Sequence, residues 1–106
     1  MVKILLALVS ISISLPCFGS TPGEIKETHL QAEQGIASAQ INLGVMYAEG
    51  QGVPEDNVFA YMWFNLAAQG YEDAKNNKGI ISKLMTKEQI AEAQKLSREW
   101  LAKHSE

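Results

Sequence analysis

The chain has 106 residues, with nine basic and twelve acidic side chains and a formal net charge of −3 at pH 7. Arg98 is its one arginine, and no stretch of the sequence concentrates basic residues. Nucleic-acid binding requires clustered lysine and arginine to neutralise phosphates, so this composition argues against a nucleic-acid partner. The length suits one small domain.

The amino-terminal segment has the pattern of a secretory signal peptide. Lys3 precedes an apolar run over residues 4–15, and small residues suited to a signal peptidase stand at Gly19 and Ser20. The run is 12 residues long, whereas a helix needs about 20 to span a bilayer. We therefore predict cleavage near Gly19 or Ser20 in preference to a retained membrane anchor. Lipid modification at Cys17 is a further alternative.

Removal of residues 1–19 leaves one domain, residues 20–106, without cysteine. Because Lys3 leaves with the signal, eight basic and twelve acidic side chains remain, a net charge of −4. A chain without cysteine has no disulfide and no thiol chemistry. We expect a periplasmic or secreted protein with no stable membrane insertion after signal removal.

Five helices are predicted in the rest of the chain. The first has a start signal, with Thr21 as cap, proline in the first turn and Glu24 placed to bond back to the cap. The last helix has a similar start signal, a capping box from Thr86 to Gln89. It also has a charged face, which suits a helix at the end of a stack. Asp56 is expected to cap the third. We expect the helices over residues 22–34, 38–49, 57–69, 72–84 and 87–103.

Two features predict how these helices pack. Gly44 lies inside the second helix, where glycine costs about 1 kcal/mol relative to alanine. We attribute its presence to the close approach of a neighbouring helix. The third helix carries more apolar side chains than a single stripe requires, so we expect it to be buried on two sides.

A segment of the sequence recurs at an offset of 35 residues. The first copy contains Ala32, Gln34, Gly35 and Ala39. The same residue types recur 35 positions later as Ala67, Gln69, Gly70 and Ala74. A period in this range is typical of stacked helix-turn-helix units. The sequence thus predicts an all-α fold, a short α-solenoid of antiparallel helix pairs.

The residues from Ala32 to Asp56 fit a longer pattern. They read Ala-x-x-Gly-x-Ala-x-Ala-Gln-x-x-Leu-Gly-x-Met-Tyr-x-x-Gly-x-Gly-Val-Pro-x-Asp, followed by Ala60, Trp63 and Ala67. This closely resembles the Sel-one-like repeat, a relative of the tetratricopeptide repeat. The resemblance implies a right-handed stack, with a full repeat over about residues 32–68. Residues 69–104 lack the Gly-Pro loop and are interpreted as a degenerate second repeat.

The resemblance also implies a function. Repeat stacks of this kind usually serve as binding surfaces, so we expect a small exported adaptor or assembly protein that binds a protein or peptide and has no catalysis of its own. By analogy with tetratricopeptide-like stacks, the groove would be formed by the first helix of each pair. Its candidate residues are Ser38, Asn42, Glu49, Asn76, Asn77 and Lys83; the alternative is that each is an ordinary solvated position.

A second candidate surface lies on the third helix. Tyr61, Met62 and Asn65 would form it if exposed, and the alternative is burial of this group against the fourth helix. An exposed Tyr-Met pair would favour binding. A large exposed apolar patch on the third helix would favour a binding surface over burial against the fourth helix.

The aromatic residues of the repeat also allow two interpretations. Tyr47, Phe59 and Trp63 could form an aromatic recognition site, or they could fill the space between helices that small residues bring close together. We interpret Tyr47 and Trp63 as core residues.

The sequence offers little for catalysis or for cofactors. His29 and His104 stand near opposite ends of the domain without metal-ligand spacing, so we predict no metal site. The glycine-rich loop over residues 50–52 lacks the Lys-Ser/Thr of a phosphate-binding loop, and no serine has a nucleophile context. We therefore expect neither cofactor nor enzymatic activity.

Two alternatives remain at this point. One is an envelope hydrolase or a cell-wall or β-lactam-binding protein of the cysteine-rich repeat type, although those relatives carry a Cys pair in each repeat and residues 20–106 have none. The other is self-association that buries an incomplete stack.

Overall fold

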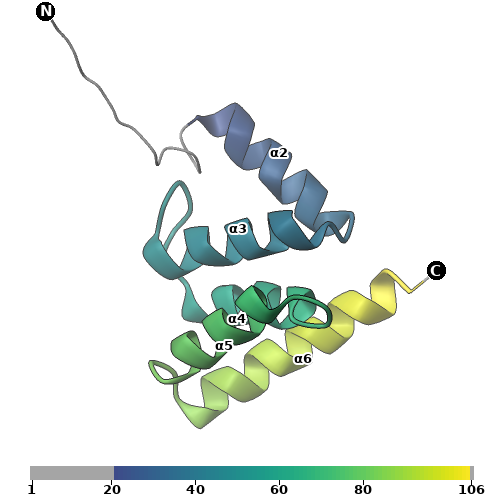
Figure 1. The fold of residues 1–106 in the computed structure, drawn as a ribbon. Coiled ribbons are helices and arrows are strands. Elements are labelled where there is room, and N and C mark those ends of the chain that lie inside the picture. The colour runs from purple at the N-terminus through teal and green to yellow at the C-terminus, as the bar shows by residue number, and fades with distance from the viewer. Residues whose placement is uncertain (1–20, 106) are drawn as a thin grey trace, which may run out of the picture.

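The fold is described by a computed structural model that covers residues 21–105. The predicted signal peptide lies outside this range. Within it the chain forms five α-helices and no strand, which confirms the predicted all-α solenoid (Figure 1). The helices are α2 (Pro22–Glu33), α3 (Ala37–Glu49), α4 (Asn57–Ala67), α5 (Glu72–Ser82) and α6 (Lys87–Lys103).

The local signals in the sequence account for most helix ends. Thr21 Oγ1 accepts from the Glu24 amide, and Glu24 Oε1 accepts from the Thr21 amide. Thr86 and Gln89 repeat this capping box at the start of α6. Asp56 Oδ1 accepts the first free amides of α4. α3 is capped at its carboxyl end by Gly50, whose φ of 70° is a left-handed conformation that glycine adopts at little cost.

Helix α4 lies at the centre of the fold. It packs against α3 on one side and against α5 and α6 on others, while α2 packs against α3. Seven of its eleven residues are buried, so the prediction that this helix is covered on two sides is confirmed. The first cluster of core residues joins α2, α3 and α4 through Ala32, Leu43 and Trp63. The second joins α4 to α5 and α6 through Phe64, Ile81 and Ala93.

Gly44 allows α3 and α4 to come close together. A Cβ atom at this position would lie 2.5 Å from Cε1 and 2.7 Å from Cδ1 of Phe64. Contacts this short force the ring to move. The close helix approach predicted from this glycine is therefore confirmed, and the neighbour is the Phe64 ring. None of the helices between residues 21 and 105 has the length and apolar content needed to cross a bilayer.

Candidate functional site

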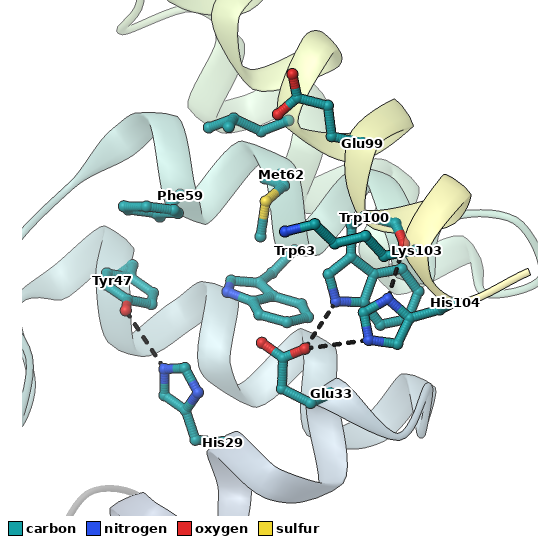
Figure 2. A pocket seen from close by; sticks show the side chains of 11 residues that line it. His29, Glu33, Tyr47, Phe59, Met62, Trp63, Glu99, Trp100, Lys103 and His104 are labelled. Atoms are coloured by element: carbon teal, nitrogen blue, oxygen red, sulfur yellow. Dashed lines mark hydrogen bonds and ion pairs between the residues drawn. The ribbon is translucent and has the colours of Figure 1, made fainter.

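Two hollows lie on different faces of α4. The larger, here called the aromatic cleft, has a volume of about 360 Å³ and lies between α2, α4 and α6 (Figure 2). The smaller, here called the α3–α5 groove, has a volume of about 170 Å³. The aromatic cleft is lined by His29, Glu33, Tyr47, Phe59, Met62, Trp63, Leu96, Glu99, Trp100, Lys103 and His104.

Helical spacing brings the lining residues of the aromatic cleft together. Residues three or four apart share one face of a helix, which aligns Phe59, Met62 and Trp63 on α4. The same spacing aligns Trp100 and Lys103 near the end of α6, with His104 as its carboxyl-terminal cap. The cleft thus combines faces of α2, α4 and α6 with Tyr47 of α3.

Aromatic rings form the floor and walls of the cleft. Trp63 is only 2% exposed and forms the floor. Its ring meets the Trp100 ring edge to face at a centroid distance of 6.1 Å, and the His29 ring similarly at 6.3 Å. The Tyr47 and Phe59 rings lie 5.3 Å apart. Phe59 is 38% exposed, so its ring surface remains open to a ligand.

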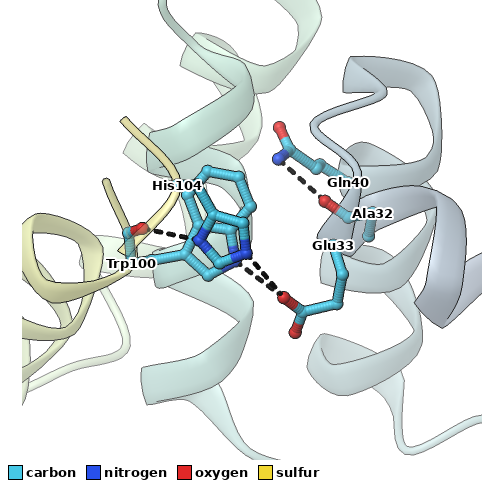
Figure 3. A network of polar contacts seen from close by, with 5 residues as sticks. All are labelled: Ala32, Glu33, Gln40, Trp100 and His104. Atoms are coloured by element: carbon cyan, nitrogen blue, oxygen red, sulfur yellow. Dashed lines mark hydrogen bonds and ion pairs between the residues drawn. The ribbon is translucent and has the colours of Figure 1, made fainter. Parts of the chain in front are cut away.

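A carboxylate of α2 connects to the end of α6 (Figure 3). Trp100 Nε1 donates to Glu33 Oε1 at 3.0 Å, and His104 Nε2 lies 3.4 Å from the same oxygen. The His104 ring stacks on Trp100 at 3.8 Å with an interplanar angle of 11°. Its Nδ1 lies 2.7 Å from the Trp100 carbonyl oxygen. Both ring nitrogens therefore face acceptors, and only the protonated imidazole donates to both.

The end of α2 is held in place from α3. The buried side chain of Gln40 donates through Nε2 to the carbonyl oxygen of Ala32 at 3.1 Å (Figure 3). Ala32 is fully buried and directly precedes Glu33. This hydrogen bond satisfies a carbonyl in the last turn of the helix, and it fixes the backbone from which Glu33 reaches α6.

The remaining polar groups of the cleft set its chemistry. Burial raises the pKa of Tyr47, and the carboxylates of Asp56 and Glu33 raise it further. The phenol therefore stays protonated at neutral pH and serves as a hydrogen-bonding group rather than a base. Its oxygen lies 3.5 Å from Nε2 of His29. Between residues 21 and 105, no three His, Cys, Asp or Glu side chains are grouped as metal ligands would be.

The α3–α5 groove is mainly apolar. Phe64 of α4 forms part of its lining, together with Ile80, which is 62% exposed. Glu49 and Asn77 contribute the polar groups of the lining. The complete lining is Val45, Ala48, Glu49, Phe64, Asn77, Ile80 and Ile81.

The structure brings two of the six predicted groove residues together. Glu49 of α3 and Asn77 of α5 both line the α3–α5 groove. Four others are exposed on or beside the same two helices but line neither hollow: Ser38, Asn42, Asn76 and Lys83. Only Glu49 and Asn77 of the predicted site thus line a hollow, and the apolar lining of that hollow was not identified from the sequence.

The second surface predicted on α4 is wrong. Tyr61 and Met62 are each 6% exposed, because Tyr61 packs with Ile81 and Ala93 in the second core cluster. Met62 belongs to the first core cluster and contributes to the aromatic cleft. Asn65 is half-buried and accepts a hydrogen bond of 3.1 Å from Nζ of Lys78.

The sequence did not reveal the aromatic cleft. Trp63 is a core residue as predicted, but Tyr47 is only half-buried and faces the cleft with Phe59. His29 and His104 were described as lying at opposite ends of the domain, and the fold brings both to the same cleft. His104 is exposed, and its ring stacks on Trp100 at the edge of the cleft.

Comparison with known proteins finds a family match in the central part of the chain. The family model described as Sel1 repeat matches residues 37–70, which comprise α3, the glycine-rich loop and α4. This segment is thus similar to a Sel1 repeat. The Gly44–Phe64 approach and the Asp56 cap both lie inside the matched segment.

A solved structure supports the same assignment. The crystal structure of a protective antigen present in uropathogenic Escherichia coli strains, described as displaying an SLR fold, matches with a TM-score of 0.73 and 32% sequence identity. The match covers 76% of this chain and 18% of that chain, so the present chain spans less than a fifth of that protein. No curated protein matches the chain.

Proposed function

We propose that this chain is a small exported adaptor that binds another polypeptide through the α3–α5 groove and has no catalytic activity of its own. Sel1 repeats generally serve as protein-interaction modules, which supports the class of function. The apolar lining of the groove carries the proposal. An isoleucine that is 62% exposed beside an apolar hollow is the kind of surface that a partner covers.

The polar groups of the groove fit an extended segment of a partner. Asn77 offers an amide that both donates and accepts, and Glu49 offers a carboxylate acceptor. Groups of this kind bond the backbone of a peptide while Ile80 and Phe64 contact its apolar side chains. The geometry is that of a shallow binding surface with apolar contacts at its centre.

Export is the second part of the proposal, and the amino-terminal sequence supports it. The short apolar run with small residues at Gly19 and Ser20 is typical of a cleaved signal. Expression of the full chain in a bacterial host, followed by mass spectrometry of the periplasmic fraction, tests this part. We expect a chain that begins near residue 20; an intact chain confined to the cytoplasm would contradict export.

Crosslinking capture from the envelope fraction tests the groove. We expect the exported protein to retain a specific partner, and Ile80→Asp to abolish retention because it places a charge in the apolar contact. Leu30→Asp is the matched control, since Leu30 is 50% exposed on α2 and lines neither hollow. Equal capture by both variants would exclude the α3–α5 groove as the binding surface.

A further inference from the structure

We propose that the aromatic cleft is a second binding site, which takes an arginine side chain from a partner polypeptide. The cleft lies on a different face of α4 from the α3–α5 groove, and the two share no lining residue. This inference therefore does not depend on the groove. The volume of about 360 Å³ is at the small end of the range for ligand sites, roughly 300–1,000 Å³, and suits one long side chain.

The charges of the cleft favour a cation. Two carboxylates line it, Glu33 from α2 and Glu99 from α6, against the single ammonium group of Lys103 (Figure 2). In the part of the chain that the structure describes, neither Glu99 nor Lys103 forms an ion pair within 4.0 Å. Oε2 of Glu33 receives no hydrogen bond from residues 21–105. The carboxylates are thus open to a cationic donor.

An anionic ligand would find few donors in the same cleft. The two nitrogens of His104 already face the Trp100 carbonyl and Glu33. Nε2 of His29 faces the Tyr47 hydroxyl. The ammonium group of Lys103, Nε1 of Trp63 and Nδ1 of His29 would then remain as donors, and the two carboxylates would repel an anion beside them. Charge complementarity therefore distinguishes between the two classes of ligand.

The rings favour guanidinium over ammonium. A guanidinium group is planar, is weakly hydrated and stacks on aromatic faces, while its five N–H groups bond carboxylates. The open ring surfaces of Tyr47 and Phe59 lie beside the buried Trp63 floor. An arginine that entered the cleft would stack on an exposed ring and extend its donors toward Glu33 or Glu99.

Lys103 would act as an internal competitor for this site. Its flexible side chain lies across the cleft from the last turn of α6 (Figure 2). An entering arginine must displace the ammonium group or tolerate it nearby, and like charges repel. Neutralising Lys103 should therefore strengthen arginine binding, whereas it would weaken the binding of an anion.

The two tryptophans provide the readout. The sequence contains only Trp63 and Trp100, and both line the cleft. The ¹H–¹⁵N signals of their indole groups therefore report occupancy directly. The exported protein would be titrated with acetyl-Gly-Arg-Gly-amide, with the neutral isostere in which citrulline replaces arginine, and with the lysine and glutamate versions of the same peptide.

We expect the arginine peptide to shift both indole signals in a saturable manner. The citrulline peptide should bind about tenfold more weakly, since it loses the cation–π and ionic contacts. Glu99→Gln should weaken arginine binding about threefold, and Lys103→Gln should strengthen it by a similar factor. Glu92→Gln and Lys95→Gln make the same charge changes on α6 at exposed positions outside the cleft, and should have no effect.

Equal shifts with arginine and citrulline peptides would overturn the proposal, as would the absence of any shift. Tighter binding of the glutamate peptide, or weaker arginine binding by Lys103→Gln, would show an anion site instead. Lysine binding as tight as arginine binding would contradict the guanidinium assignment. Ile80→Asp should leave the titration unchanged, so failure of the α3–α5 groove and failure of this site give different results.

Discussion

Trp100 and Glu33 are 67 positions apart in the sequence, and the indole Nε1 of Trp100 donates to the Glu33 carboxylate at 3.0 Å. This hydrogen bond joins the last helix to the first across the aromatic cleft (Figure 3). Helix α2 otherwise packs on α3, and α6 packs on α4. The contact thus sets the distance between two walls of the cleft that have no extensive packing with each other.

A double-mutant cycle should detect this contact. We expect Glu33→Ala and Trp100→Phe to show a coupling of about 1 kcal/mol in the free energy of unfolding, the usual net contribution of one hydrogen bond. Urea unfolding followed by circular dichroism measures it. Glu33→Gln keeps the acceptor and should retain most of the coupling. Strictly additive effects of Glu33→Ala and Trp100→Phe would show that the bond does not stabilise the fold.

Trp63 supports both the core and the cleft. Its side chain is 2% exposed and belongs to the cluster that joins α2, α3 and α4. Trp63→Ala should lower the free energy of unfolding by about 3–5 kcal/mol because it leaves a large cavity, which is much of the stability of a small domain. Thermal melting of parent and variant measures the loss. A variant that melts within about two degrees of the parent would contradict this role.

The fold was largely predictable because its signals are local. The capping boxes that begin at Thr21 and Thr86 each depend on residues three apart, and Asp56 caps the helix that follows it directly. Gly44 predicted a close neighbour because glycine inside a helix needs a reason. The identity of that neighbour, Phe64, came only from the fold.

The aromatic cleft was not predictable in the same way. It requires His29 and Glu33 from one helix and Trp100 and His104 from another, and no spacing in the sequence relates them. Their meeting depends on how α2 and α6 are placed by α3 and α4. The aromatic side chains also gave an ambiguous signal, since Trp63 fills the core while Phe59, on the same helix face, remains open.

The raised pKa of Tyr47 makes stability depend on alkaline pH. Burial and the nearby carboxylates of Asp56 and Glu33 disfavour the phenolate in the folded state. A group whose pKa is higher in the folded than in the unfolded state contributes stability that is fully present below its unfolded pKa, about 10 for tyrosine. That contribution is lost as the pH rises through the folded pKa.

Tyr47→Phe tests this dependence, since it removes the ionisable group and keeps the ring. We expect the free energy of unfolding of the variant to fall less steeply than that of the parent above about pH 10. Urea unfolding at a series of alkaline pH values measures both slopes. Parallel curves for the two proteins would show that ionisation of Tyr47 is not linked to unfolding.

Gly44 and Gly79 stand 35 residues apart at equivalent points of the internal repeat, and the structure predicts opposite effects of alanine at the two. At Gly44 a Cβ would meet the Phe64 ring at 2.5 Å, whereas at Gly79 nothing lies within 4 Å. The same offset places Glu99 where the first unit has Phe64. Gly79 therefore weakens its helix as any glycine does. No neighbouring ring comes close enough to require a glycine at this position.

Alanine substitution at each glycine, with urea unfolding, measures this difference. Gly44→Ala should lower the free energy of unfolding by about 1–2 kcal/mol, because the overlap with Phe64 outweighs the better helix propensity. Gly79→Ala should raise it by about 0.5–1 kcal/mol, since the propensity gain has no steric cost there. Destabilisation by both variants would mean that α5 is also closely packed at this point, and stabilisation by both would mean that Phe64 moves aside freely.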